Sequence, residues 1–297
     1  MTNPFLLPTD RNCCINFSGG RSSGYMLTKI LEAHGGVLPP NVKVIFTNTG
    51  KEHAETYRFI HEIDKRLLDG FGITWLEYRY NRRAKGRKHK DYRHTYQEVY
   101  YGTHSWRGEP FQTLIHAKRM IPNIVTRLCT VELKIKVSEY YLRRQLGWST
   151  WHSVIGFRAD EAHRAKNKNS CDSAGELPIY PMIEAGTTKD DVTDYWRCSP
   201  YDLGISSLEG NCDKCFAKGK MKIIHLLRED PSSAAWWIEQ ERWVQEHNQA
   251  KRDNKEMAQF SKRYTYEDLL YWSQLPELPM DYDDPLDNAQ MGCFCTD

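Results

Sequence analysis

The chain has 297 residues, 40% of them hydrophobic, and a formal net charge of +2 at pH 7. This length allows one large hydrophobic core and a smaller additional region. No run of about 18 apolar residues occurs and no charged leader precedes an apolar segment, so we expect neither export nor a membrane partner. Because the net charge is small, binding to nucleic acid would require a local cluster of basic residues.

Nine cysteines are present, an odd number for a chain of this length. Disulfide frameworks are typical of small secreted domains, whereas thiols in a reducing compartment bind metals or take part in catalysis. We therefore expect a cytoplasmic protein whose cysteines include metal ligands or catalytic thiols. Cys13 and Cys14, on the first predicted strand, are expected to be small buried hydrophobic residues.

The first informative segment is an apolar run, residues 14–17, that leads into a loop rich in serine and glycine and then into a helix. Adjacent glycines let the backbone turn tightly, and the N–H groups at the start of the helix attract an anion. Hydroxyl and guanidinium groups add donors suited to phosphate oxygens. The loop predicts a phosphate site, and a turn without a ligand is the alternative. Its candidate ligands are Ser18, Gly19, Gly20, Arg21, Ser22 and Ser23.

The next apolar run, residues 42–47, is typical of a buried parallel strand, and a polar loop and a helix over 53–68 follow it. In an open α/β sheet, ligands bind at the carboxyl ends of neighbouring strands. We therefore expect this loop to face the first loop across a crevice. Its candidate nucleotide-binding residues are Thr47, Asn48, Thr49, Gly50 and Glu52.

A third strand is predicted over 73–80, and a dense run of Arg, Lys and His follows it, from Arg82 to His94. An insertion at this strand end would lie at the same sheet edge as the crevice, so the run predicts a surface for the phosphate backbone of a nucleic acid. Nearby aromatic residues such as Tyr100 and Trp106 could stack on bases. The alternative is a solvated loop beside aromatic residues that belong to the core.

Strands and helices continue to alternate along the chain. A helix is predicted over 131–145, a strand over 151–157, and a helix over 187–196 with Thr187 as its cap and Asp190 three residues later. This order predicts an α/β fold with a doubly wound, mostly parallel sheet. After residue 220 the periodicity is helical, over 221–228, 231–247, 256–263 and 266–274. We therefore divide the chain into an α/β domain, 1–220, and a helical region with a cysteine-containing tail, 221–297.

Five segments in this order resemble the N-type ATP pyrophosphatases, a PP-loop superfamily that includes the phosphoadenosine phosphosulfate (PAPS) reductase family. They are SGGRSSGYML, FTNTGKEHAETYRFI, RLCT followed by Lys134, IGFRADE and GNCDKC, and together they cover roughly residues 12 to 220. The resemblance implies an adenine nucleotide alpha hydrolase-like fold that binds ATP with Mg²⁺.

In such an enzyme, negative charge develops as the α-phosphate is attacked and pyrophosphate leaves. The loop N–H groups, Arg21 and Arg158 would stabilise that charge. Asp160 and Glu161 would hold the magnesium ion or orient Arg158, and Lys134 would hold an anionic substrate. A surface ion pair is the alternative role for Arg158 and Lys134.

Cys212 and Cys215 have the two-residue gap that presents two thiolates to one metal. In the reductases that the chain resembles, an iron–sulfur cluster is held by such a pair and by adjacent cysteines near the position of Cys129. Here Thr130 stands in place of the second adjacent cysteine. The resemblance therefore implies a 4Fe–4S cluster on Cys129, Cys212 and Cys215, with Cys293 or Cys295 as the fourth ligand. Zinc held by four thiolates is the alternative.

Three functions fit these residues. The first is an ATP-dependent transferase that adenylates an oxygen of a nucleic acid or small molecule, after which sulfur displaces AMP. The loop SGGRSS favours this function, which is similar to that of DNA phosphorothioation and RNA thiolation enzymes. The second is a sulfonucleotide reductase, whose family carries its cysteine nucleophile in a short acidic C-terminal motif that residues 293–297 resemble loosely, and the third is a nucleotide-sensing, metal-binding module. The expected partners are a nucleotide, a nucleic acid, a sulfur donor protein and further copies of the chain.

Overall fold

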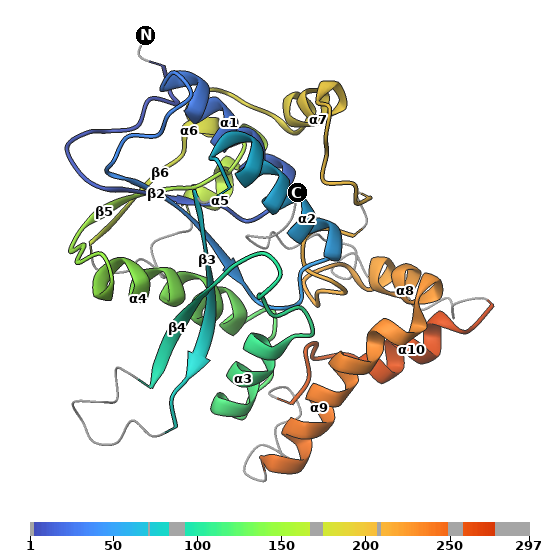
Figure 1. Cartoon of the computed structure of the whole chain (residues 1–297). Helices are drawn as coiled ribbons and strands as arrows, with labels where there is room; N and C mark the ends of the chain where they lie inside the picture. Colours follow the sequence, from blue (N-terminus) through green and yellow to red (C-terminus); the bar gives the residue numbers. More distant parts are fainter. Residues whose placement is uncertain are drawn as a thin grey trace.

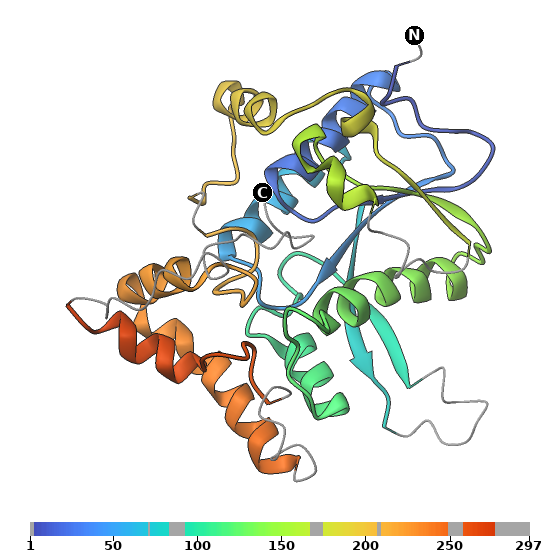
Figure 2. The same cartoon turned by 180° about the vertical axis from the view of Figure 1, so that it is seen from behind.

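The computed structural model describes residues 3–70, 72–82, 93–166, 175–206, 209–248 and 258–276. These residues form a central six-stranded sheet with helices on both faces and a group of helices at the C-terminal end (Figures 1 and 2). The strand order is β4-β3-β2-β1-β5-β6, and within the sheet only β4 runs antiparallel to its neighbour. The strands are β1 (Cys13–Asn16), β2 (Val42–Asn48), β3 (Ile73–Tyr80), β4 (His94–Val99), β5 (Trp151–Val154) and β6 (Glu176–Ile179).

The strand order reverses at one point in the sheet. The chain runs from β1 through β2 to β3 on one side, and then returns to add β5 and β6 on the other side of β1. The reversal therefore lies between β1 and β5, where the loops after both strands separate and leave room for a ligand. The prediction of a doubly wound, mostly parallel sheet is confirmed.

Successive side chains of the central strands enter two different cores. Cys13 and Ile15 pack on one face with α1 (Arg21–Ala33), α2 (Ala54–Leu67) and α7 (Lys189–Cys198), whereas Cys14 packs on the other face. Both cysteines are buried as predicted, and burial raises the pKa of Cys13 to about 11. These two thiols therefore stay protonated at neutral pH and serve as small core residues.

The second face of the sheet is covered by α3 (Glu109–Lys118), α4 (Lys136–Arg144) and the C-terminal helices. The short helices α5 (Ala162–Lys166) and α6 (Pro181–Glu184) flank β6. None of the described helices is long and apolar enough to cross a bilayer.

Two predicted elements have different bounds because local contacts override the sequence pattern. The helix predicted over 131–145 begins as a π-helix, η2 (Cys129–Ile135), before it continues as α4. The helix predicted from Thr187 is capped by Thr188 with Asp191 instead. The backbone of Thr187 forms other hydrogen bonds. Its N–H donates to the Met182 carbonyl, and its carbonyl accepts from the Ala159 N–H.

Other differences concern edge and surface segments. The strand predicted over 151–157 ends at Val154, and the described part of the predicted helix 256–263 is irregular. The sequence pattern missed β4 and β6, both edge strands. Edge strands have polar or irregular sequences, and β6 even contains Pro178, which is tolerated there because one side of an edge strand is unpaired.

The C-terminal helices share a core with the sheet. They are α8 (Lys220–Glu229), α9 (Ala235–His247) after the short helix η5 (Pro231–Ala234), and α10 (Tyr266–Ser273). The fully buried Trp237 stacks on Tyr266 with ring centroids 4.9 Å apart and meets Phe111 of α3 edge-on. Trp236, Trp243 and Trp272 are partly buried and pack against the same core.

A buried carboxylate fastens the segment after α9. Glu241 is 2% exposed, and its two oxygens accept hydrogen bonds from the backbone N–H groups of Phe260 (3.0 Å) and Tyr266 (2.9 Å). Burial dominates over these hydrogen bonds and raises the pKa of Glu241 to about 7. Folding therefore favours the protonated form of this group.

We predict that this part of the stability is fully present below about pH 4.5 and is lost as the pH rises through 7, since the unfolded chain ionises first. The expected loss is about 3 kcal/mol. Urea unfolding of Glu241→Gln at pH 5 and pH 8 should show a smaller pH dependence than the wild type. Glu239→Gln, at an exposed position, is the control and should show the same pH dependence of stability as the wild type. Equal pH dependence in all three proteins would contradict the prediction.

Candidate functional site

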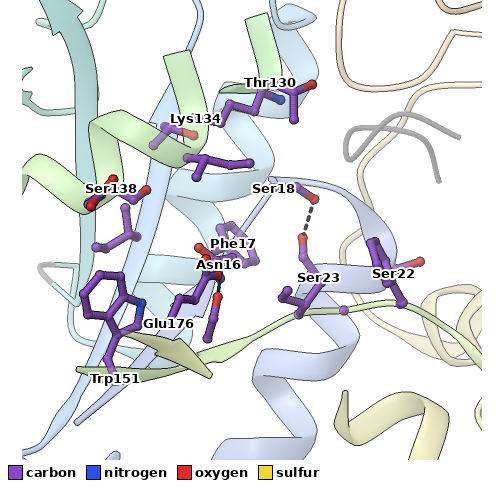
Figure 3. Close-up of a pocket in the computed structure, with 18 of the residues that line it drawn as sticks. Asn16, Phe17, Ser18, Ser22, Ser23, Thr130, Lys134, Ser138, Trp151 and Glu176 are labelled. Atoms are coloured by element: carbon purple, nitrogen blue, oxygen red, sulfur yellow. Dashed lines mark hydrogen bonds between the residues drawn. The ribbon is translucent and has the colours of Figure 1, made fainter. Parts of the chain in front are cut away.

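A pocket opens at the carboxyl ends of β1 and β5, where the strand order reverses (Figure 3). We call it the switch-point pocket. Its polar lining comes from the serine–glycine loop, from η2 and from the strand ends, and its apolar lining comes from the sheet and α4. Residues that line it include Asn16, Phe17, Ser18, Ser22, Ser23, Thr47, Lys134, Ser138, Trp151, Ser153 and Glu176.

The serine–glycine loop presents the start of α1 to this pocket. The N-cap of α1 is Gly20, no described side chain caps the helix, and its first turn holds no acidic residue. Gly19 has φ +82°, and a Cβ there would lie 2.8 Å from side-chain atoms of Ile60 and Thr56, so only glycine fits. The loop thus leaves the N–H groups and positive end of α1 available to an anion.

Hydroxyl groups fix the shape of this loop. The Ser18 and Ser23 hydroxyl oxygens lie 3.1 Å apart, and the Ser23 hydroxyl donates to the carbonyl of Gly20 (2.9 Å). Figure 3 shows both side chains on the loop side of the pocket. These bonds hold the loop in one geometry before any ligand binds.

Arg158, which follows β5, joins the two strand ends. Its side chain is 8% exposed, and its Nη1 donates to the Ser22 hydroxyl (2.8 Å). Asp160 and Glu161, on the short helix η3 (Ala159–Glu161), each lie 3.3 Å from its guanidinium. Glu161 also pairs with Arg164. The carboxylates orient Arg158 toward the loop, so this arginine is buried rather than part of an exposed surface ion pair.

Arg21 lies differently from what the sequence suggested. Its guanidinium binds both carboxylate oxygens of Asp202 (2.7 and 2.6 Å) and the Ile205 carbonyl (3.1 Å). Burial opposes the charged form of Asp202, but hydrogen bonds from Arg21 and the backbone hold its pKa below the usual value. Arg21 therefore borders the outer side of the loop and does not line the switch-point pocket.

Lys134 belongs to a row of side chains, four residues apart along η2 and α4, that faces the pocket beside Ile135 and Glu139. Thr130, Lys134, Ser138 and Leu142 all line the pocket, while Leu133 lies in the core. Such π-helical turns are rare and are frequent at functional sites. Figure 3 shows Thr130 and Lys134 across the pocket from the loop serines, which places the lysine where it can meet an anion.

The loop after β2 contributes less surface than the sequence predicted. Thr47 lines the pocket, but Asn48, Thr49 and Glu52 are buried. The pocket opens toward β5, so beyond Thr47 the residues predicted on this loop do not line it, and their part in nucleotide binding stays a prediction.

The buried polar groups of that loop hold one another. The Asn48 amide donates to Glu77 (2.7 Å) and to the Ser105 carbonyl (2.7 Å), and the Thr49 hydroxyl donates to Glu52 (2.8 Å). The positive φ of +79° at Gly50 and its close approach to Gly108 complete the turn. These hydrogen bonds hold the carboxyl end of β2 in place without lining the pocket.

Several lining residues escaped the sequence analysis. The Asn16 amide donates to the Ser153 hydroxyl (2.6 Å), so β1 and β5 are joined by side chains at the pocket floor. Trp151 and Glu176 close the far end, as seen in Figure 3. A polar residue within an otherwise apolar buried strand was the available signal for Asn16 and Ser153.

The loop that carries Cys212 and Cys215 is fastened to this site. The Asn211 carbonyl accepts from the His53 N–H (2.7 Å), its amide donates to the Ser18 carbonyl (3.2 Å), and Cys212 forms a β-bridge with Glu52. The loop therefore packs directly on both strand-end loops.

The described residues contain no group of three or more side chains placed to hold a metal. Cys129, Cys212 and Cys215 belong to or pack against the same core, and Cys293 and Cys295 lie outside the described residues. The described cysteines do not form a metal site by themselves, so the cluster stays a prediction that needs the tail.

Most of the basic run, residues 83–92, also lies outside the described part of the chain. Arg82 follows β3 as expected but lines a small pocket with α3 rather than the switch-point pocket. Tyr100 and Trp106, at 62% and 59% exposed, are surface residues rather than core.

An open α/β sheet with an anion-binding helix start at its switch point defines a nucleotide-binding class of protein. The model of the phosphoadenosine phosphosulfate reductase domain matches residues 12–199, more than half of the chain. The chain therefore belongs to that family, as the sequence motifs indicated. The matched residues include the serine–glycine loop and Arg158 and end before Cys212.

Two individual proteins are also similar to this chain. A protein of Escherichia phage lambda, the uncharacterized nin region protein ORF290, is 28% identical over 218 residues, which is 70% of this chain and 67% of that protein. The crystal structure of a phosphoadenylyl-sulfate (PAPS) reductase from Candida auris in a phosphate complex is 14% identical. That match has a TM-score of 0.36 and covers 65% of this chain and 76% of the other.

The serine–glycine loop can be tested at Gly20. Its backbone (φ −94°, ψ 170°) is open to any residue, and Asp and Asn are both good N-caps, so Gly20→Asp and Gly20→Asn should both fold. Only the first adds a negative charge where phosphates would bind. We predict that Gly20→Asp weakens ATP binding by at least about tenfold by calorimetry, while Gly20→Asn stays close to wild type. Equal affinities in the two variants would contradict a phosphate site here.

Proposed function

We propose that the protein cleaves ATP to AMP and pyrophosphate in order to adenylate an acceptor for sulfur transfer. The observation that carries the proposal is the buried Arg158, held by two carboxylates and bonded to Ser22 at the uncapped start of α1. A fixed guanidinium beside a helix start provides the positive groups that a departing pyrophosphate requires.

The shape of the pocket suits an adenine nucleotide. The apolar side chains of Phe17, Ile45 and Trp151 would enclose the base, and the Glu176 carboxylate would accept from its amino group. The phosphates would then extend toward Ser18, Ser22 and Ser23, because those groups lie at the opposite end of the pocket.

The proposed reaction has two steps. An acceptor oxygen attacks the α-phosphorus, the bond from that phosphorus to the bridging oxygen breaks, and pyrophosphate leaves. A sulfur nucleophile then displaces AMP from the adenylated acceptor. Arg158 and the α1 N–H groups would stabilise the charge on the phosphates, and Lys134 would neutralise the nucleotide from the opposite wall.

Magnesium would reach the site with ATP. This ion commonly uses one or two protein carboxylates together with substrate phosphates and water. Asp160 is the more exposed of the two candidate carboxylates, at 43%, but only Glu161 lines the pocket. Glu161 is less available because it is held by two arginines.

A sulfonucleotide reductase is the second candidate function, and the family name supports it. Such an enzyme needs a cysteine nucleophile beside the bound nucleotide. Among the described residues no cysteine lines the switch-point pocket, so this function would depend on the tail residue Cys295. A nucleotide-sensing module would bind ATP without cleaving it.

Product analysis separates these functions. We predict release of AMP and pyrophosphate in equal amounts from ATP when DNA or RNA is supplied together with a sulfide donor, and release of pyrophosphate alone, with AMP retained on the acceptor, when the donor is withheld. Arg158→Ala should lower the rate by about 10²–10³-fold, because one preorganised donor to the developing charge is lost. The exposed Arg11→Ala is the control and should leave the rate unchanged. Reduction of adenylated sulfate to sulfite without pyrophosphate release would establish the reductase function instead.

The proposed cluster has its own test. Protein purified without oxygen should be brown and contain iron and labile sulfide, since four thiolates including one from the tail would be available. Cys212→Ser should lose the iron, whereas Cys198→Ser, at an exposed cysteine outside the proposed set, should retain it. Colourless protein with one equivalent of zinc would contradict the prediction.

A further inference from the structure

A second cleft adjoins the switch-point pocket on the outer side of the serine–glycine loop. Its lining comes from α7 and from Asp202, Ile205, Ser206 and Gly210, and it shares Ser22 and Arg158 with the first pocket. We call it the α7 cleft. Four of its lining side chains are basic and one, Asp202, is acidic; the basic residues are Arg21, Arg158, Lys189 and Arg197.

The charges of this lining are only partly balanced. Each of the three arginines pairs with a carboxylate. Lys189 is exposed and, within the described ranges, forms no ion pair with a carboxylate. Its place in the first turn of α7 opposes the helix dipole, so it weakens the helix slightly and leaves a positive charge at the cleft.

Two further lysines lie near the cleft, close enough for their charges to act on one another. A Cβ on Gly210, which lines the cleft, would lie 3.8 Å from the Lys218 side chain. Burial, and then the ammonium groups of Lys189 and Lys218, lower the pKa of Lys222. Lys189 belongs to α7, Lys218 to the loop before α8, and Lys222 to the first turn of α8. That turn of α8 holds no acidic residue. Like charges from separate elements therefore converge here.

Among the described residues, no carboxylate forms an ion pair with Lys189 or Lys222, although Asp190 and Asp191 share the first turn of α7 with Lys189. The Lys218 ammonium donates to the carbonyl of Cys212. Bringing like charges together costs free energy unless an anion binds between them. The α7 cleft thus has an excess of positive charge directly beside the proposed phosphate loop.

We propose that the α7 cleft is a second phosphate-binding site, which holds the backbone of a nucleic-acid strand as the acceptor. Its assignment as the acceptor site rests on the proposed function, since Ser22 and Arg158 would face ATP on one side and the acceptor on the other. Its affinity for phosphate does not depend on that function. A strand carries several phosphates, so it can contact Arg21 within the cleft and the lysines at its mouth together.

The second source of the same phosphate chemistry is pyrophosphate released from ATP. A single pyrophosphate would bind close to the shared residues Ser22 and Arg158. A strand would also engage Lys222, which lies outside the cleft lining. The contribution of Lys222 therefore separates the two sources.

The test measures anisotropy of a labelled single-stranded DNA and an RNA of the same sequence across a salt series. Lys189→Ala and Lys222→Ala should each weaken binding about three- to tenfold and reduce the slope of log affinity against log salt by about one. Lys65→Ala, at an exposed lysine in the last turn of α2, is the matched control and should bind like wild type. ATP affinity, measured by calorimetry, should be unchanged in all three variants.

The outcomes distinguish this site from the proposed function. Strand affinity that is unchanged in Lys189→Ala and Lys222→Ala would overturn the acceptor site. Loss of inorganic pyrophosphate binding in these variants, with strand binding intact, would also overturn it and assign the cleft to the leaving group. If ATP is not cleaved but both lysine variants lose strand affinity, the phosphate site stands and the proposed function fails.

Discussion

The hydrogen bond between Arg158 and Ser22 is the contact on which the rest of the site depends. It joins the segment after β5 to the start of α1, two parts of the chain that are distant in sequence and adjacent in the sheet. A guanidinium that is almost fully buried needs compensating charge, and Asp160 and Glu161 supply it. Because these partners fix its orientation, the arginine adds a positive charge to the helix start without having to move.

The buried polar groups around the second loop give the site its rigidity. Burial and the neighbouring Glu52 carboxylate raise the pKa of Tyr57 far above its usual value, so its hydroxyl stays protonated and donates to Asn48 (3.0 Å). Asn211 ties the Cys212 loop to Ser18 in the same way. Buried hydrogen-bond networks of this kind favour one arrangement, since others would leave more buried groups without partners. Changes in the loop that carries Cys212 would therefore be transmitted to the serine–glycine loop through direct contacts.

The positions of the two clefts follow from the topology of the sheet. The switch-point pocket lies above β1 and β5, and the α7 cleft lies on the other side of the serine–glycine loop. The loop separates them, and only Ser22 and Arg158 line both. A two-substrate reaction benefits from such an arrangement, because each substrate keeps its own entrance while the reacting groups meet at a shared wall.

The sequence by itself determined the four inner strands, the alternation of strands and helices around them and the loop around Gly19 and Gly20, because buried strands and glycine turns depend on local residue patterns. It also marked Arg158 and Lys134 through motifs. Only the tertiary structure decided that the pocket opens toward β5, that Arg21 turns to Asp202, and that Lys189 lines a cleft together with Ser22 and Arg158. These are pairings between distant segments, and they are set by how helices pack on a twisted sheet, which no local pattern encodes.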